Sequence, residues 1–141
     1  MADYPSLSDL PLVSTLDAIP QMCFIYRDDG LLVALNCHCE QLLGVPRAAL
    51  VGTFNLFEHP EMIDGELRAR YQEAFRGVPQ VVPAIELPIG AADLPGPERR
   101  ESVFWVETIL VPLAHRDDGS APYVLGIQRD VTELMGVRRE I

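Results

Sequence analysis

The sequence has no apolar run long enough to span a bilayer, and its first eleven residues hold no basic segment followed by an apolar stretch. We therefore expect a cytoplasmic protein without a membrane span. Positive charge is also scarce, because 11 Lys and Arg residues stand against 21 Asp and Glu residues, and the formal net charge is −10. Such a charge repels phosphate backbones and anionic lipids, so we expect no direct contact with nucleic acid or with membranes.

Cysteine is rare and does not form the pattern of a disulfide framework. The sequence contains three cysteines, two of which, Cys37 and Cys39, flank His38. Consecutive helical residues point about 100° apart, so this tripeptide cannot turn all three side chains toward one tetrahedral metal ion. We therefore expect reduced thiols and no metal site, with Cys39 in the core beside Leu42 and Leu43 and with His38 exposed.

Signatures of catalysis are missing as well. The sequence has no glycine-rich phosphate loop, no nucleophile-elbow pentapeptide and no His-Glu-x-x-His motif, and we expect a protein that is not an enzyme. One enzymatic alternative stays open, since a small α+β domain with a buried carboxylate of raised pKa can act as an isomerase. That chemistry requires an inward-facing acid, and Glu107 lies in an expected strand whose facing the sequence leaves undecided.

What the chain does contain is enough for one compact domain, since 48% of its 141 residues are hydrophobic. Two pairs of apolar, β-branched and aromatic segments predict two hairpins. The first joins 22–27 to 31–35 through Asp28-Asp29-Gly30, and the second joins 103–113 to 122–131 through Arg116-Asp117-Asp118-Gly119. In each turn the Asp-Gly step supplies the positive φ that a tight turn requires.

Capping residues delimit two short helices after the first hairpin. Asn36 stands where an N-cap is wanted, and Gly44 stands where a left-handed residue would end the helix. Pro46 then begins a second helical turn, which Gly52 ends. The sequence therefore predicts two consecutive short helices, one over 36–44 and one over 46–52.

The longest expected helix begins at Pro60 and ends at Gly77. Its apolar residues are spaced four apart, so they share one face that must be buried against the sheet. The prolines within 77–87 favour an edge strand, and 88–100 is expected to be a mobile loop. The residues of the apolar helix face are Ile63, Leu67, Tyr71 and Phe75.

An amphipathic helix is predicted near the start of the chain, from Ser8 to Ile19. Its apolar stripe needs a cover, and the sequence leaves two open: the outer face of its own sheet, or a second subunit. Because an apolar stripe of this size is not expected to stay in contact with water, we expect a homodimer formed by this stripe and the exposed sheet face. The stripe consists of Leu10, Leu12, Val13 and Leu16.

The order of these elements resembles that of PAS sensory domains, from about Leu16 to Leu134. The resemblance rests on NCHCEQLLGVPRAALVG after the second strand and on Asp130-Val131-Thr132-Glu133 at the end of the last strand. It implies an α+β fold with a five-stranded antiparallel sheet, helices packed on one face and an N-terminal flanking helix. The implied organisation is a flanking helix over 1–20, a PAS domain over 21–132 and the start of a C-terminal signalling helix over 133–141.

The same resemblance implies a sensory and dimerisation module of a larger regulatory protein. Its C-terminal output domain would be of the kinase, transcription-regulator or cyclic-nucleotide type, and its signal a small molecule or a protein partner. Asp130, Thr132 and Glu133 would couple the sheet to that output. In the fold, the space between the sheet and the long helix is a ligand cavity, which we expect to hold a small, mainly apolar molecule or to be closed by side chains. Its expected lining is Leu43, Phe54, Phe57, Leu67, Tyr71, Phe75 and Gln128.

A flavin-binding light or redox sensor is a further alternative, because Phe104-Trp105 and Gly126-Ile127-Gln128 resemble the last two strands of the light-sensing LOV subgroup. Two departures count against it: Asn55 stands where that subgroup has its reactive cysteine, and Val106 replaces a flavin-binding asparagine. Haem is not expected either, because His59 precedes a helix-initiating proline and the long helix has no histidine. The cofactor therefore stays unknown, and we expect neither flavin nor haem.

Overall fold

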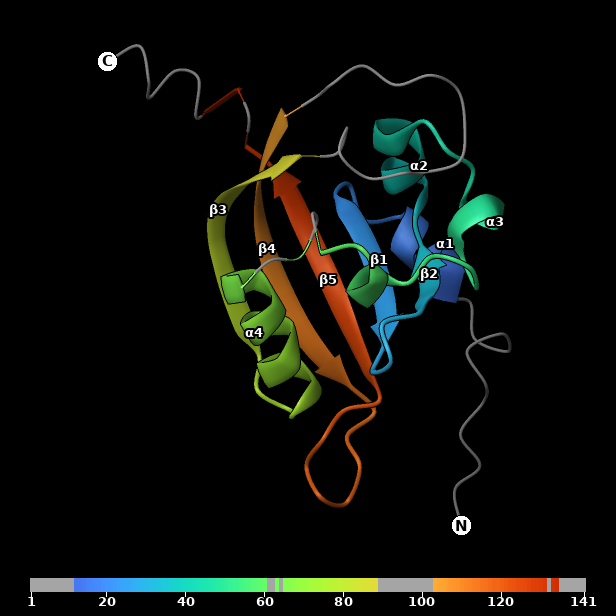
Figure 1. The fold of residues 1–141 in the computed structure, drawn as a ribbon. Coiled ribbons are helices and arrows are strands. Elements are labelled where there is room, and N and C mark those ends of the chain that lie inside the picture. The colour runs from blue at the N-terminus through green and yellow to red at the C-terminus, as the bar shows by residue number, and fades with distance from the viewer. Residues whose placement is uncertain (1–11, 61–62, 64, 89–102, 132, 135–141) are drawn as a thin grey trace.

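The five-stranded antiparallel sheet predicted from the sequence is confirmed. The computed structural model describes the chain except residues 1–11, 61–62, 64, 89–102, 132 and 135–141. Every neighbouring pair of strands is antiparallel, and the order across the sheet is β2-β1-β5-β4-β3 (Figure 1). The strands are β1 (Met22–Arg27), β2 (Leu32–Leu35), β3 (Gln80–Pro88), β4 (Val103–Leu113) and β5 (Tyr123–Asp130).

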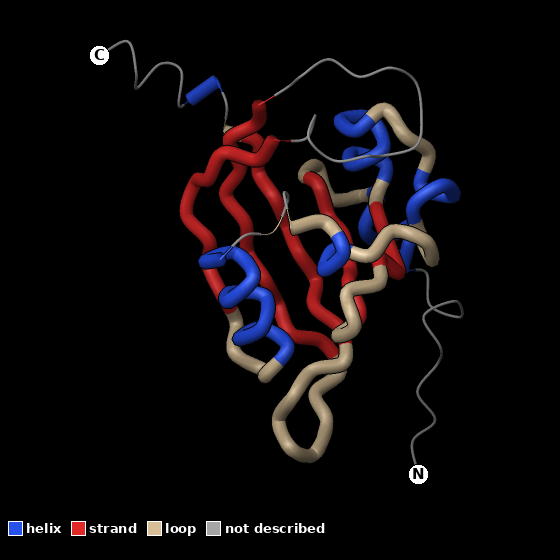
Figure 2. The backbone as a smooth tube through the Cα atoms, viewed as in Figure 1, coloured by secondary structure: helices blue, strands red, loops and turns tan. Residues whose placement is uncertain are grey.

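Helices cover the two faces of this sheet unequally. Most of them lie between β2 and β3 in the chain and pack on what we call the inner face, whereas α1 packs on the opposite, outer face (Figures 1 and 2). The helices are α1 (Leu12–Asp17), α2 (Cys37–Leu43), α3 (Arg47–Leu50), the 3₁₀ turn η1 (Leu56–Glu58) and α4 (Gly65–Phe75).

Both caps predicted for α2 are present, Asn36 at its start and Gly44 at its end. The Asn36 side chain accepts a hydrogen bond from the Cys39 backbone N–H, and Gly44 has the left-handed φ of 70°. A residue with a Cβ would disfavour this conformation, which explains why the helix ends at a glycine. The Gly44 N–H donates to the Glu40 carbonyl, so the last turn closes without an unpaired amide.

The predicted edge strand is confirmed, because β3 pairs only with β4 among the described strands. Its register shifts between Val82 and Ile85, where Pro83 provides no N–H for a ladder hydrogen bond. The second hairpin is longer than a tight turn: pairing ends at Leu113 and Tyr123, and 116–119 form a local turn inside the connection. The loop expected over 88–100 lies outside the described residues apart from Pro88.

Close packing at the centre of the sheet depends on a residue without a side chain. Phe24 of β1 lies opposite Gly126 of β5. A Cβ added to Gly126 would come within 2.1 Å of the Phe24 ring. The ring therefore occupies the space that a side chain on β5 would fill, and it packs edge-on against Tyr26 with ring centroids 5.3 Å apart.

A single buried side chain joins α1, β1 and α2. The Asn36 Nδ2 donates to the carbonyls of Leu16 and Gln21, at 2.9 and 2.7 Å, while its Oδ1 accepts from the N–H groups of Cys23 and Cys39, at 3.1 and 3.2 Å. Asn36 is fully buried. Its carboxamide thus satisfies four backbone groups from three segments, so the N-cap predicted from sequence is also a tertiary clamp.

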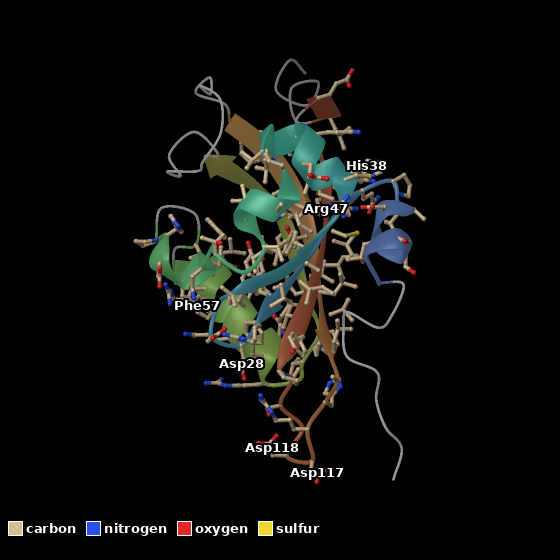
Figure 3. All side chains as sticks on the ribbon, turned by 90° about the vertical axis from the view of Figure 1, so that its right-hand side faces the viewer. Asp28, His38, Arg47, Phe57, Asp117 and Asp118 are labelled. Atoms are coloured by element: carbon tan, nitrogen blue, oxygen red, sulfur yellow. The ribbon has the colours of Figure 1, made fainter. Side chains whose placement is uncertain are left out.

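A second link between α1 and the inner-face helices is ionic. The Arg47 guanidinium lies 3.1 Å from Asp17 Oδ2 and 3.0 Å from Glu40 Oε1, and it donates to the Leu35 carbonyl at 3.1 Å. Its hydrogen bond to Asp17 holds the pKa of that carboxyl below its usual value. Arg47 therefore connects the end of α1 to α2 across the end of β2 (Figure 3).

We predict that Asn36→Ala lowers the free energy of unfolding by about 3 kcal/mol or more, because four buried backbone groups would lose their partner. Chemical denaturation of the chain measures this change, and Gln72→Ala, on an exposed position of α4, is the matched control. A loss below about 1 kcal/mol, the typical worth of one hydrogen bond, would contradict the clamp.

Candidate functional site

The apolar residues expected to line the cavity pack together on the inner sheet face. Phe54 and Tyr71 belong to the main buried cluster, which also contains Phe24, Tyr26 and Val106 from the sheet. The other apolar residues of the expected lining are partly buried and pack against that cluster: Leu43, Phe57, Leu67 and Phe75.

Aromatic side chains fill much of the space between α4 and the sheet. Tyr71 of α4 packs edge-on against Tyr26 of β1 with ring centroids 5.9 Å apart, and Phe75 packs on Phe57 at 6.3 Å. Burial raises the pKa of both tyrosine hydroxyls above their ordinary value. This region is therefore an apolar environment in which these four residues pack against one another.

Two polar side chains interrupt the apolar inner face. Gln128, expected from sequence, pairs across β5 and β4 with Thr108, and strand alternation places both on the side of Val124 and Leu110. Thr108 is 1% exposed, and its hydroxyl has no hydrogen-bond partner among the described residues. Thr108 was not among the residues expected from the sequence, although its position two residues from Val106 in an alternating strand is the signal that could have indicated it.

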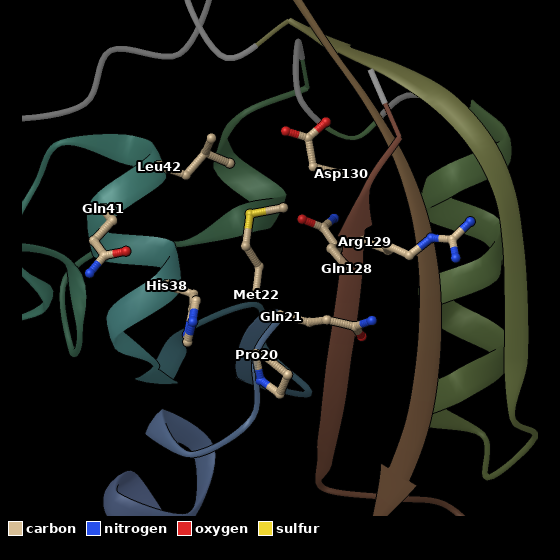
Figure 4. A pocket seen from close by; sticks show the side chains of 9 residues that line it. All are labelled: Pro20, Gln21, Met22, His38, Gln41, Leu42, Gln128, Arg129 and Asp130. Atoms are coloured by element: carbon tan, nitrogen blue, oxygen red, sulfur yellow. The ribbon is translucent and has the colours of Figure 1, made fainter. Parts of the chain in front are cut away.

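A pocket of about 510 Å³ lies at one end of the sheet, away from α4. Its walls come from α2, from the segment joining α1 to β1, and from the end of β5 (Figure 4). Of the expected cavity residues only Gln128 lines it. It is lined by Pro20, Gln21, Met22, His38, Gln41, Leu42, Gln128, Arg129 and Asp130.

The expectation for His38 was wrong, because the histidine is half-buried and lines this pocket rather than lying exposed. Its ring extends from α2 on the side of the pocket opposite β5 (Figure 4). The expectation for Cys39 is confirmed: it is 3% exposed, and burial raises the pKa of its thiol to about 12. In a helix of seven residues, the sequence pattern does not decide whether a residue near the end, such as His38, faces solvent or the protein.

No group of three metal-ligating side chains occurs within the part of the chain that the structure describes. In the Cys37-His38-Cys39 tripeptide the two thiols lie against different partners. Cys37 Sγ lies 3.8 Å from the Asp17 carbonyl, whereas Cys39 Sγ lies 3.4 Å from the Cys23 carbonyl. His59 stacks on Phe54 with ring centroids 4.7 Å apart.

The two positions that depart from the LOV pattern have structural roles of their own. Asn55 caps η1, since its Oδ1 accepts from the Phe57 N–H at 3.0 Å and its Nδ2 donates to the Asp29 carbonyl at 3.0 Å. Val106 is 1% exposed and belongs to the inner-face core. Asn55 thus caps a helical turn, and Val106 packs in the core.

Glu107, whose facing the sequence left undecided, lies on the outer face. Its carboxylate is 3.4 Å from the Arg129 guanidinium, and both side chains are about half exposed. Among the described residues the buried polar side chains are Asn36 and Thr108, neither of which is an acid. Glu107 therefore does not provide the inward-facing carboxylate that an isomerase would require.

The end of β5 leads directly to the expected output residues. Asp130 is exposed and lines the pocket, and the next residue, Val131, is buried and donates its N–H to the Trp105 carbonyl at 2.7 Å. Glu133 is exposed in a short helical segment. Thr132 lies outside the described residues. The chain thus stays anchored to β4 for one residue beyond the sheet.

On the outer face, α1 covers only part of the sheet. Leu16 is 3% exposed and packs on Cys23, Ile25 and Ala34, so for this residue the cover is the chain's own sheet. Leu10 lies outside the described residues, and the side chains of Leu12 and Val13 do as well. None of the helices in the described ranges is long and apolar enough to cross a membrane.

Comparison with known proteins identifies the fold. The PAS domain of BvgS from Bordetella pertussis superposes with a TM-score of 0.57 at 16% identity, over 92% of this chain and 90% of that one. The PAS domain of an HTR-like protein from Haloarcula marismortui gives 0.59 at 19%, over 84% and 88%. The LOV protein of Rhodobacter sphaeroides gives 0.63 at 17%, over 85% of this chain and 65% of that one.

The present chain thus spans less than two thirds of the length of that LOV protein. No curated protein matches the sequence. The PAS fold family matches residues 16–135, which is most of the chain and includes all five strands. This chain therefore belongs to the PAS fold family.

Proposed function

We propose that the chain is a sensory and dimerisation module of a larger regulatory protein. A small molecule or a protein partner would shift the balance between two arrangements of the sheet and its flanking helices, and a C-terminal output domain would respond. The observation that carries the proposal is the path of β5. Gln128 lies on the inner face, Asp130 follows at the pocket wall, and Val131 is anchored to β4 before the exit segment begins.

This path supports signalling because a displacement at the inner face reaches the exit within three residues. A ligand changes the output only if it binds one arrangement more tightly than the other. The inner-face cluster provides an apolar environment that suits a small, mainly apolar molecule, and its aromatic residues pack against one another there. No turnover is required of the module. The output domain we propose is of the kinase, transcription-regulator or cyclic-nucleotide type.

We predict that the purified protein contains no visible chromophore. Val106 is packed in the core and Asn55 is engaged in capping, so neither position offers the groups that a flavin would need. An absorbance scan, followed by fluorescence of the supernatant after denaturation, measures this directly. A flavin band in the blue or a haem Soret band would reverse the assignment and favour a light or redox sensor.

We propose that the homodimer forms through the outer face of β3, β4 and β5, beside α1. Val81, Ile109 and Ile127 pair in one row across these strands, and Val81 and Ile109 are 68% and 47% exposed. This row continues to buried Cys23, which α1 helps to cover. An exposed apolar row next to a covered one is a surface on which a second copy can pack.

We predict that Ile109→Arg weakens association at least about tenfold, because it places a charge in the centre of the apolar row. Light scattering and sedimentation over a concentration series measure the effect, with Gln72→Arg on α4 as the control. Leu16→Glu also affects association, but it unfolds α1 from its own sheet and is therefore a poorer test. A monomeric unmutated protein at high micromolar concentration would refute the dimer.

We predict that Asp130→Ala changes output while leaving the melting temperature within about 5 °C. A carboxylate at a strand-to-helix junction can cap the first turn, which is worth about 1 kcal/mol. That energy is small beside the stability of a domain but comparable to a gap between two signalling states. Wild-type and variant modules fused to a reporter output domain would be compared for basal activity. Equal activities with equal stability would leave Asp130 without a coupling role.

A further inference from the structure

The pocket at the end of the sheet differs in chemistry from the apolar space beneath α4. One wall is apolar and contains Met22 and Leu42, and these side chains extend into the region between α2 and the end of β5 (Figure 4). The Gln128 carboxamide and the Asp130 carboxylate extend from β5, where Gln128 lies directly across from Met22 of β1. A volume of about 510 Å³ lies within the range of small-molecule sites.

Charge distinguishes this pocket further. Two charged residues line it, Arg129 and Asp130, but the Arg129 side chain extends away from the others (Figure 4) toward Glu107, whose Oε1 is 3.4 Å from its guanidinium. The Asp130 carboxylate remains at the pocket wall. A carboxylate has about four acceptor sites, so it can accept from a ligand in addition to any contact it already makes.

The remaining polar groups are compatible with a positively charged guest. Gln128 and Gln41 contribute carboxamide oxygens, which accept hydrogen bonds, and neither side chain has a hydrogen-bond partner within the described residues. The chain as a whole has a net charge of −10, which attracts cations and repels anions. A thioether and a leucine beside these acceptors favour a guest that also has an apolar, for example aromatic, body.

We propose that this pocket binds a small organic cation, an ammonium group attached to an apolar body, with the ammonium at Asp130 and Gln128 and the body against Met22 and Leu42. This goes beyond the apolar occupant proposed for the inner face, because it assigns a second site and a different class of ligand. The site also touches both ends of the module: Pro20 and Gln21 follow α1, and Asp130 precedes the exit segment.

Binding at Asp130 provides a route to the output. If Asp130 caps the exit segment as proposed, an ammonium group bound to the same carboxylate changes the strength of that cap, so occupancy of the pocket and the state of the exit become linked. This link rests on the proposed signalling function, whereas the binding step does not. The two can therefore be tested separately.

The test compares three probes of similar shape: 2-phenylethylammonium, 2-phenylethanol and 3-phenylpropanoate. Each is titrated at pH 8 into the ¹⁵N-labelled full chain, and amide chemical shifts report both the affinity and the location. For guests of this size we expect a Kd of about 1–10 mM. The cation should bind at least about fivefold more tightly than the alcohol, because it adds a charge-assisted hydrogen bond, and the anion should bind most weakly. The shifts should map to Met22, His38, Leu42 and Gln128.

Two isosteric variants distinguish the effect of the Asp130 charge on ligand binding from the effect of the net charge of the chain. Asp130→Asn should abolish the preference for the cation over the alcohol. Asp117→Asn removes the same formal charge at the tip of the loop between β4 and β5, far from His38 (Figure 3), and should leave the preference intact. Both positions are exposed, so both variants should keep the wild-type melting temperature.

Several results would overturn the proposal: equal affinity for the cation and the alcohol, equal losses in the two variants, shifts centred on Tyr71 and Phe75, or no binding up to about 20 mM. A reporter fusion then addresses the link to output. Binding in the isolated chain without any change of reporter activity would remove the link to signalling and leave the site in place. If the reporter responds to Asp130→Ala but the chain binds no cation, the signalling role of Asp130 would stand and the cation site would be refuted.

Discussion

The arrangement of this domain depends on the buried carboxamide of Asn36. An unpaired backbone group costs free energy when it is removed from water, and the junction of α1, β1 and α2 buries several such groups at once. One amide side chain with two donors and one acceptor oxygen satisfies four of them. The same contact fixes the Gln21 carbonyl, so it also positions Pro20, Gln21 and Met22, which form the floor of the end pocket.

The two faces of the sheet are covered differently. The inner face is closed by α4 and its aromatic residues, and its only buried polar side chain on a described strand is Thr108, opposite Gln128. The outer face is covered by α1 at β1 and β2 and is exposed at β3 and β4. Such an asymmetric sheet fits the proposed module, in which a ligand would act on the inner side and a second copy would pack on the outer face.

In the proposed module, sensing and output would meet at the ends of β1 and β5. Arg47 ties α1 to α2 across the end of β2, and the end pocket is formed between α2 and β5, so the N-terminal flank, the pocket and the exit segment are in contact through a few residues. In the proposed module a change at any one of them would alter the balance at the others, as two-state coupling requires. The anchored Val131 would keep this coupling short, because its N–H donates to the Trp105 carbonyl of β4 just before the exit segment.

Much of the fold follows from local chemistry in the sequence. Alternating apolar residues, Asp-Gly turns, Asn36 and Gly44 predicted the strands, the first hairpin and the limits of α2, since each depends on a few neighbouring residues. Tertiary structure decided the strand order, the half-buried His38 and the outward facing of Glu107, and it left the Thr108 hydroxyl without a partner among the described residues. These properties depend on which distant segment packs opposite a residue, and a periodicity of two or 3.6 identifies a shared face but not the partner that covers it. The end pocket has the same origin, because its residues come from three segments that only the folded chain brings together.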